Sequence, residues 1–422
     1  MSLSPRPLGK LSGDMLAIGA GHSVFAFGQW MIGVAIAKLA GVEAMAAFGF
    51  ALMISAPIYF LTGMGLRTAL ARDAAGALPF SDYWQARIAG AVAAALLMAL
   101  AGFTVAAGRG FDGTAALLAF ALVKSADAGF DLIYGLRQRD GQARAVWHSL
   151  LRRGLLGPAA CAAALAATGG ELWAGLSAWA GAACILLLWQ DAPAARAARR
   201  REPARTGALG VFKSCWPLGV GAAVASLETA IPRYVIEWRM EPDALGYFTG
   251  LFLFFQAIIL VGNAFGSAAT PHLGRAHAAG DFKRFNRLLL GLLALAVLIG
   301  GGGVAVAALI GPWLLGIVYT PAYSAYADIF TLIMAAAALR LVASFLQFAI
   351  IAAGRFKAHM GVHLTIATIA LAIAPALVGA HGLAGAAYVL IVATVVQLLL
   401  LAALAWRGGK ASRDVPPSPD PS

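Results

Sequence analysis

The basic residues of this chain gather in the connections between long apolar runs, and this pattern constrains the fold more than any other feature. Read as membrane helices of ordinary length, the runs number about twelve. Of the 31 Lys and Arg residues, 25 then lie in alternate connections and tails on one side. Because basic residues near span ends resist translocation, we expect an even number of spans with both termini in the cytoplasm. The predicted spans are 15–37, 44–66, 86–108, 114–136, 150–168, 171–190, 215–237, 244–267, 288–310, 325–352, 361–380 and 383–406.

Composition supports a membrane protein and excludes several other classes. Hydrophobic residues make up 61% of the 422 residues and charged residues only 12%, whereas soluble domains carry roughly 25% charged residues. The loops are too short for a soluble enzyme domain, so we expect an all-α polytopic membrane protein that is not an enzyme. Basic cytoplasmic loops, rather than nucleic-acid binding, account for the net charge of +12. The sequence has no GxxxxGK phosphate loop, which argues against ATP-driven transport by this chain alone.

The clearest internal boundary is a basic stretch at 191–213, which carries six Lys and Arg residues. It separates two predicted six-helix bundles, 15–190 and 214–406. A short cytoplasmic N-terminus (1–14) and a Pro- and Ser-rich tail (407–422), expected to be disordered and cytoplasmic, flank them. The basic stretch is explained either by topology alone or by additional binding of anionic lipid.

The two bundles resemble distant repeats of each other. VEAMAAFGFAL at 42–52 matches PDALGYFTGLF at 242–252, each at the start of a second span. Six spans is an even number, so both bundles have the same orientation. Parallel repeats of this kind place the binding site between the halves, around a central cavity.

Six basic residues break the topological pattern. Three fall on the opposite side (Lys38, Arg109 and Arg239), and three lie inside apolar runs (Lys124, Arg233 and Arg340). A charge in hydrocarbon costs about 2.5–3.5 kcal/mol on insertion scales unless it lines a cavity or is paired. The three internal cations are therefore the first candidates for a functional site.

The fourth span is the most polar. Lys124, Asp127 and Asp131 are spaced i, i+3, i+7 and so share one helix face. This face is either an internally neutralised cluster that stabilises helix packing or a charged wall of a central cavity. Three such groups would be hard to accommodate against lipid.

Spans seven and ten carry the other internal charges. Glu228 and Arg233 flank Pro232, which removes a backbone donor and bends or breaks the helix. Arg233 either faces a cavity or extends to the outer surface. Arg340 lies near the middle of its run, with Gln347 on the same face, so we expect it to face an aqueous cavity.

Polar pairs seven residues apart occur in two further spans. His22 pairs with Gln29, and Gln256 pairs with Asn263. Each pair either hydrogen-bonds between helices or lines the cavity. The three cysteines have no metal-type spacing and are expected to be small buried residues, and no metal site is predicted.

Several segments resemble polysaccharide-biosynthesis flippases of the Wzx-like kind, in the multidrug/oligosaccharidyl-lipid/polysaccharide exporter superfamily. ETAIPRYVIEWRMEPDALGYFTGLFLF at 228–254 is similar to that family's seventh and eighth spans. SADAGFDLIYGLRQRDGQARAVWHSLLRRG at 125–154 is similar to a first-half segment of the family, although Gly129 and Phe130 stand before Asp131 where the family has a Ser-Asp pair.

The resemblance implies two bundles around a central cavity that work by alternating access. Its implied cargo is a polyprenyl-pyrophosphate-linked oligosaccharide, moved to the outer leaflet of the bacterial inner membrane for surface or exported polysaccharide. Its implied partners are a polysaccharide polymerase and glycosyltransferases. No cofactor is expected beyond a coupling H⁺ or Na⁺.

A pyrophosphate cannot cross hydrocarbon uncompensated, and cationic side chains in a wet cavity can hold it. Arg233, Arg340 and Lys124 are the candidates, and the two arginines are favoured because a guanidinium matches phosphate oxygens. Gln347, Gln29, Gln256 and Asn263 are further cavity candidates, and Asp127, Asp131 and Glu228 are candidates for binding the coupling ion. Two alternatives remain: a cation-coupled multidrug antiporter of the same fold, and a non-transporting membrane scaffold for glycan synthesis.

Overall fold

The computed structural model describes residues 8–73, 78–104, 110–205, 207–352 and 356–413, and within these ranges it contains helices and no strands. The elements are α1 (Leu8–Leu39), α2 (Gly41–Gly63), α3 (Leu66–Arg72), α4 (Phe80–Thr104), α5 (Gly110–Arg139), α6 (Ala143–Thr168), α7 (Leu172–Leu186), the π-helical turn η2 (Leu187–Asp191), α8 (Ala192–Arg201), α9 (Gly207–Arg239), α10 (Pro242–Ala278), α11 (Phe282–Val318), the 3₁₀ turn η3 (Pro321–Tyr326), α12 (Ala327–Ala352) and α13 (Phe356–Arg413). Arg109 lies outside the described residues.

The helices account for the predicted membrane crossings. Ten helical stretches of the described chain are long and apolar enough to span a membrane. One of them, within α13, breaks at Gly382 (φ 58°, ψ −133°), where the chain turns back so that Gly385 lies against the Leu377 backbone. Counting the two arms of α13 separately and adding the 30-residue α5 gives twelve crossings. The predicted all-α polytopic fold is therefore confirmed.

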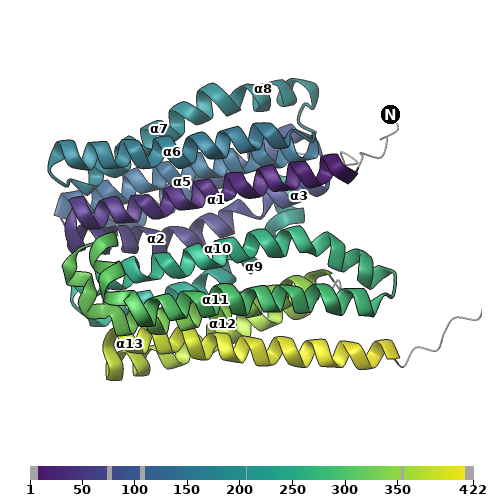
Figure 1. The fold of residues 1–422 in the computed structure, drawn as a ribbon. Helices are drawn as coiled ribbons and strands as arrows, with labels where there is room; N and C mark the ends of the chain where they lie inside the picture. Colours follow the sequence, from purple (N-terminus) through teal and green to yellow (C-terminus); the bar gives the residue numbers. More distant parts are fainter. Residues whose placement is uncertain (1–7, 74–77, 105–109, 206, 353–355, 414–422) are drawn as a thin grey trace, which may run out of the picture.

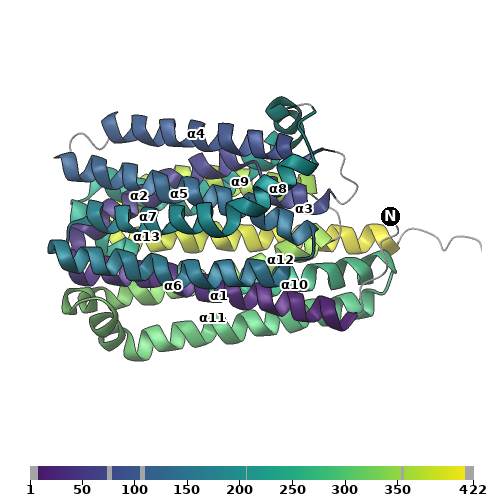
Figure 2. The same cartoon turned by 90° about the horizontal axis from the view of Figure 1, so that it is seen from above.

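The helices form two lobes. Figure 1 shows α1–α8 in an upper layer and α9–α13 in a lower layer, with the long helices running side by side along the bundle. The view from above in Figure 2 shows the same alignment. The start of α1 and the end of α13 lie at one end of the bundle, together with α8 (Figure 1). We call this end the basic end, because α8 carries four arginines, and the other the far end.

Glycines bring the two lobes together toward the far end. A side chain at Gly49 of α2 would collide with Thr249 of α10, and one at Gly246 of α10 would collide with the Val42 backbone of α2. Gly33 of α1 likewise lies against Leu253 of α10. Small residues allow membrane helices to approach this closely. The lobes are consequently closed against each other at the far end.

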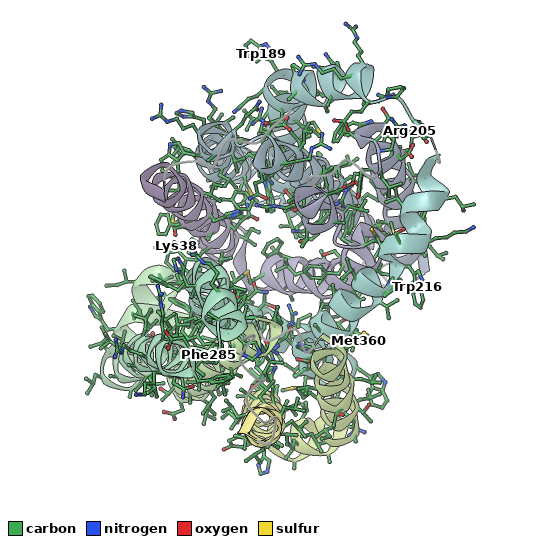
Figure 3. All side chains as sticks on the ribbon, turned by 90° about the vertical axis from the view of Figure 1, so that its right-hand side faces the viewer. Lys38, Trp189, Arg205, Trp216, Phe285 and Met360 are labelled. Atoms are coloured by element: carbon green, nitrogen blue, oxygen red, sulfur yellow. The ribbon has the colours of Figure 1, made fainter. Side chains whose placement is uncertain are left out.

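The basic connection between the lobes is largely helical and docks on the first lobe. The carboxylate of Glu202 accepts a hydrogen bond from the Phe80 amide (2.8 Å) and pairs with Arg139 (2.6 Å). The Arg205 amide donates to Asp82 (3.0 Å). These bonds fix the connection to the start of α4 and the end of α5, while the side chains of Trp189 and Arg205 point outward from the bundle (Figure 3).

Candidate functional site: a cationic cavity between the lobes

A cavity of about 890 Å³ lies between the two lobes. Its walls come from α1–α6 of the first lobe and from α9 and α10 of the second. The lining extends from Arg67 and Arg87, near the basic end, to Trp30, Phe48 and Leu253, beyond which the glycine contacts bring the lobes together. The cavity therefore faces the basic end and is closed toward the far end.

The cavity wall is strongly cationic. Its charged members are five cations and two carboxylates, a net charge of +3 with His22 neutral: Arg67, Arg87, Lys124, Arg153, Arg233, Asp127 and Asp131. Such a wall attracts an anion and repels a cation, and the low-dielectric surroundings strengthen both effects.

On α5, Asp127 is held between two cations. Lys124 Nζ lies 3.3 Å from Asp127 Oδ2, and Arg153 of α6 binds Oδ1 of the same carboxylate. The Arg153 guanidinium also stacks 3.9 Å over the ring centre of Phe130 and donates to the Tyr134 hydroxyl. The predicted charged face of span four is thus both an ion-paired cluster and a wall of the cavity.

One turn further along α5, Asp131 faces two arginines from other elements. Arg87 of α4 lies 3.2 Å from Oδ2, and Arg67 of α3 lies 3.6 Å from Oδ1. Local backbone geometry places Arg67: α2 ends at two left-handed residues, Met64 (φ 48°) and Gly65 (φ 59°), and α3 starts immediately after them. Gly135 then lets α3 approach α5, since a β-carbon there would lie 2.9 Å from the Arg67 carbonyl oxygen.

Behind this wall, a buried polar chain supports Tyr134. Its hydroxyl is 2.6 Å from Ser149 Oγ, which donates to Asp191 Oδ2 at 2.8 Å. Arg137 pairs with the same Asp191 at 2.5 Å. Asp191 is the last residue of the π turn η2, whose extra residue per turn redirects side chains and often occurs at functional sites. The turn thereby supplies the internal anion that fixes Arg137 and orients Ser149.

Among the described residues, Arg233 is the one charged wall residue contributed by the second lobe. It is 3% exposed, and its guanidinium lies 4.6 Å from the ring centre of Phe252. Within the described part of the chain it has no ion-pair partner, and its Nε and Nη1 have no hydrogen-bond partner. A buried guanidinium without a counter-ion is costly, so its presence in the wall points to a ligand that supplies the missing anion.

The other polar residues predicted in the second lobe form a separate cluster. Glu228 binds Arg340 (3.0 Å) and His363 (2.5 Å) through its two oxygens. Gln397 accepts from Arg340 at 2.7 Å, and Gln347 lies 3.1 Å from His363 Nε2. The cluster joins α9, α12 and both arms of α13, so it holds the second lobe together.

The predicted site residues divide between these two places. Lys124, Asp127, Asp131, Arg233, Gln29 and Gln256 line the cavity. Glu228, Arg340 and Gln347 belong to the separate cluster, and Asn263 is exposed on α10 without lining the cavity.

The sequence interpretation missed three wall arginines: Arg67, Arg87 and Arg153. All three were counted among the topogenic residues near span ends. One signal was available, because Arg87 and Arg153 each lie at or inside the edge of a predicted span, where a charge needs a partner.

A second, apolar pocket of about 380 Å³ adjoins the cavity and shares five lining residues with it: His22, Ala26, Trp30, Ala257 and Leu260. It lies between α1 and α10, which belong to different lobes, and its remaining lining residues are Ser23, Phe27, Phe254 and Val261. Phe27 is 61% exposed on the outer surface of α1. The apolar pocket thus connects the polar cavity with the lipid-facing side of the molecule.

Together, the lobes and the cavity between them define a multi-pass helical membrane protein with the fold of the MATE and MurJ proteins. A multidrug resistance MATE family transporter of the MOP superfamily in an inward-facing conformation superposes with a TM-score of 0.75, at 13% identity over 93% of this chain and 96% of that one. The lipid II flippase MurJ in an inward closed conformation gives 0.73, at 13% identity over 93% and 87%. The MATE multidrug transporter DinF-BH in complex with R6G gives 0.69, at 15% identity over 96% and 98%. No protein-family model and no curated protein sequence matches the chain.

Proposed function

We propose that this protein is a flippase that moves a polyprenyl-pyrophosphate-linked oligosaccharide across the bacterial inner membrane by alternating access, for surface or exported polysaccharide. The single observation that carries the proposal is the cationic cavity, with Arg233 buried in its wall and without a counter-ion among the described residues. A pyrophosphate head supplies the anion that this wall lacks, and a guanidinium binds phosphate oxygens through paired hydrogen bonds.

The apolar pocket between α1 and α10 supports a cargo with a lipid tail. Its walls are almost entirely apolar, and it adjoins the cavity at Ala26 and Trp30. A polyprenyl chain in this pocket stays in contact with hydrocarbon while its pyrophosphate occupies the cavity. The apolar tail of the cargo then does not have to pass through water.

The same cavity argues against a multidrug antiporter for organic cations. The MATE transporters share this fold, so the fold alone fits either activity. A net charge of +3 in the wall, however, disfavours a cationic drug on entry and favours an anion. In the proposed cycle, H⁺ or Na⁺ binds at a carboxylate, with Asp127, Asp131 and Glu228 as the candidates. The basic end faces the cytoplasm, where the cargo and its glycosyltransferases are found.

The proposal is tested by leaflet-resolved transport in proteoliposomes. Purified protein is reconstituted into vesicles that contain a polyprenyl-pyrophosphate-linked oligosaccharide. A membrane-impermeant glycosidase then reports the fraction of the oligosaccharide that is exposed on the outer surface of the vesicles. We expect wild-type protein to make the whole pool accessible with time, and Arg233→Gln to slow this at least about tenfold through loss of one charge-assisted contact.

Arg239→Gln is the matched control, because Arg239 is exposed at the far end and stacks on Trp238 outside the cavity. Its rate should equal that of the wild type. Absence of any glycan movement by wild-type vesicles, together with efflux of a fluorescent organic cation, would establish the antiporter instead. Movement of neither would support the scaffold alternative.

A further inference from the structure

Asp131 lies between two arginines of the cavity wall and is the most accessible of the three. Its side chain is 41% exposed, compared with 23% for Arg67 and 7% for Arg87. One carboxylate oxygen faces each guanidinium, at 3.6 Å and 3.2 Å respectively. The Asp131 carboxylate therefore lies on the cavity side, and the two guanidiniums lie behind it.

Apart from Asp131, the two guanidiniums are held differently, Arg67 by further contacts and Arg87 by its burial. Arg67 Nε donates to Gln138 at 3.3 Å, and its guanidinium lies 5.7 Å from the ring centre of Tyr134. Arg87 is buried in α4, and its Nε has no hydrogen-bond partner within the described chain. Removing the Asp131 carboxylate would therefore leave Arg67 held by Gln138 and leave the buried Arg87 without the acceptor of its Nη2 hydrogen bond, so that both cations have unused donors.

The surroundings of Asp131 favour an anion at this position. The other polar groups in this part of the cavity wall are His22 of α1, which lies 3.4 Å from Arg67, Tyr134 of α5 itself and Arg153 of α6. Asp127 is the nearest other carboxylate on α5, and it is already bound by Arg153 and Lys124. The two guanidiniums that share the Asp131 carboxylate also present N–H donors for hydrogen bonds to the two phosphates of a diphosphate.

We propose that Arg67 and Arg87 form an anion subsite for the diphosphate of the cargo, and that Asp131 is its built-in counter-anion. When the cavity is empty, the Asp131 carboxylate occupies the subsite and neutralises part of the wall. An entering diphosphate displaces the carboxylate, and the returning carboxylate later assists release. Asp131 thus weakens binding enough for the cargo to leave. This inference rests on the proposed function.

The test uses isothermal titration of inorganic pyrophosphate into the full-length protein in lipid nanodiscs at low, fixed salt. Asp131→Asn removes the competing charge with little change in shape, and we expect binding about tenfold tighter than wild type. Arg67→Gln should bind about tenfold more weakly. The control is Arg144→Gln, an exposed arginine outside the cavity wall, which should bind as wild type.

The outcomes separate the inference from the proposed function. Equal or weaker binding by a folded Asp131→Asn protein overturns the counter-anion role. Unchanged binding by Arg67→Gln overturns the subsite, and this variant decides the matter even where Asp131→Asn fails to fold, because Arg67 is partly exposed. Glycan movement by a wild-type protein that binds no pyrophosphate overturns the subsite and leaves the flippase function standing.

Discussion

Arg340 lies 3.0 Å from Glu228 in the interior of the second lobe, and neither side chain lines the cavity. The two residues are 112 positions apart, on α12 and α9, and both lie in apolar spans. The pair neutralises its own charges, in contrast to Arg233, whose guanidinium has no ion-pair partner in the described chain. Arg340 and Arg233 therefore differ: Arg340 ties helices of the second lobe together, and Arg233 lies in the cavity wall without a counter-ion among the described residues.

The first prediction concerns the Glu228–Arg340 pair. Glu228→Gln removes the carboxylate and leaves the Arg340 charge uncompensated, which should destabilise the protein by about 3–5 kcal/mol. The measurement is the denaturation midpoint of the purified protein in detergent. Adding Arg340→Met to Glu228→Gln should recover most of the loss, because the uncompensated charge is then gone. A double variant that is as unstable as the single one would contradict this account.

The second prediction is that Arg233 costs stability and contributes function. Because its charge is buried without a counter-ion, Arg233→Met should leave the denaturation midpoint unchanged or raise it, while glycan movement falls. Added pyrophosphate should raise the midpoint of the wild type more than that of the variant. A marked loss of stability in Arg233→Met would mean that this arginine serves packing.

What the sequence could predict is shown by α5. The spacing of Lys124, Asp127 and Asp131 placed all three on one face, and the structure places all three in the cavity wall. Both interpretations of that face apply, since Lys124 and Asp127 are paired and line the cavity together. Helical periodicity suffices here because the relationship lies within one element.

Relationships between distant helices were beyond the sequence. Nothing within span ten indicated that Arg340 has Glu228 as its partner, because the pairing depends on how α9 and α12 pack. Arg87 was assigned to topology because a basic residue at a span end ordinarily extends to the interface. Arg87 is buried against the end of α2, where a β-carbon at Gly63 would lie 3.4 Å from its Nη1, and α2 ends there at the left-handed residues Met64 and Gly65. Such a turn at a methionine has no reliable sequence signal.

The third prediction tests the role of Gly135 in placing Arg67. In Gly135→Ala the added β-carbon would lie 2.9 Å from the Arg67 carbonyl oxygen, so α3 must shift away from α5. We expect pyrophosphate binding to weaken severalfold although no charge has been removed. Gly102→Ala is the control, because its β-carbon would meet only side chains at 3.5 Å in the first lobe. Wild-type affinity in Gly135→Ala would show that the approach of α3 is not needed.

The fourth prediction concerns closure at the far end. Alternating access requires the contact between Gly49 of α2 and Thr249 of α10 to open in each cycle. A β-carbon at Gly49 would lie 3.0 Å from Thr249 Cβ, slightly closer than the roughly 3.5–4.5 Å of a disulfide, so a small helix shift permits the bond. The double variant Gly49→Cys/Thr249→Cys is made with Cys161, Cys184 and Cys215 replaced by alanine, to exclude other pairings.

After oxidation, this variant should bind pyrophosphate from the basic end with wild-type affinity but move no glycan, because the cavity cannot open to the other side. Reduction should restore movement, and each single-cysteine variant should be unaffected by oxidant. The cross-linked fraction is followed by a mobility shift on non-reducing gels after cleavage in the loop between the lobes. Full-rate movement by fully cross-linked protein would exclude opening at this contact as part of the transport cycle.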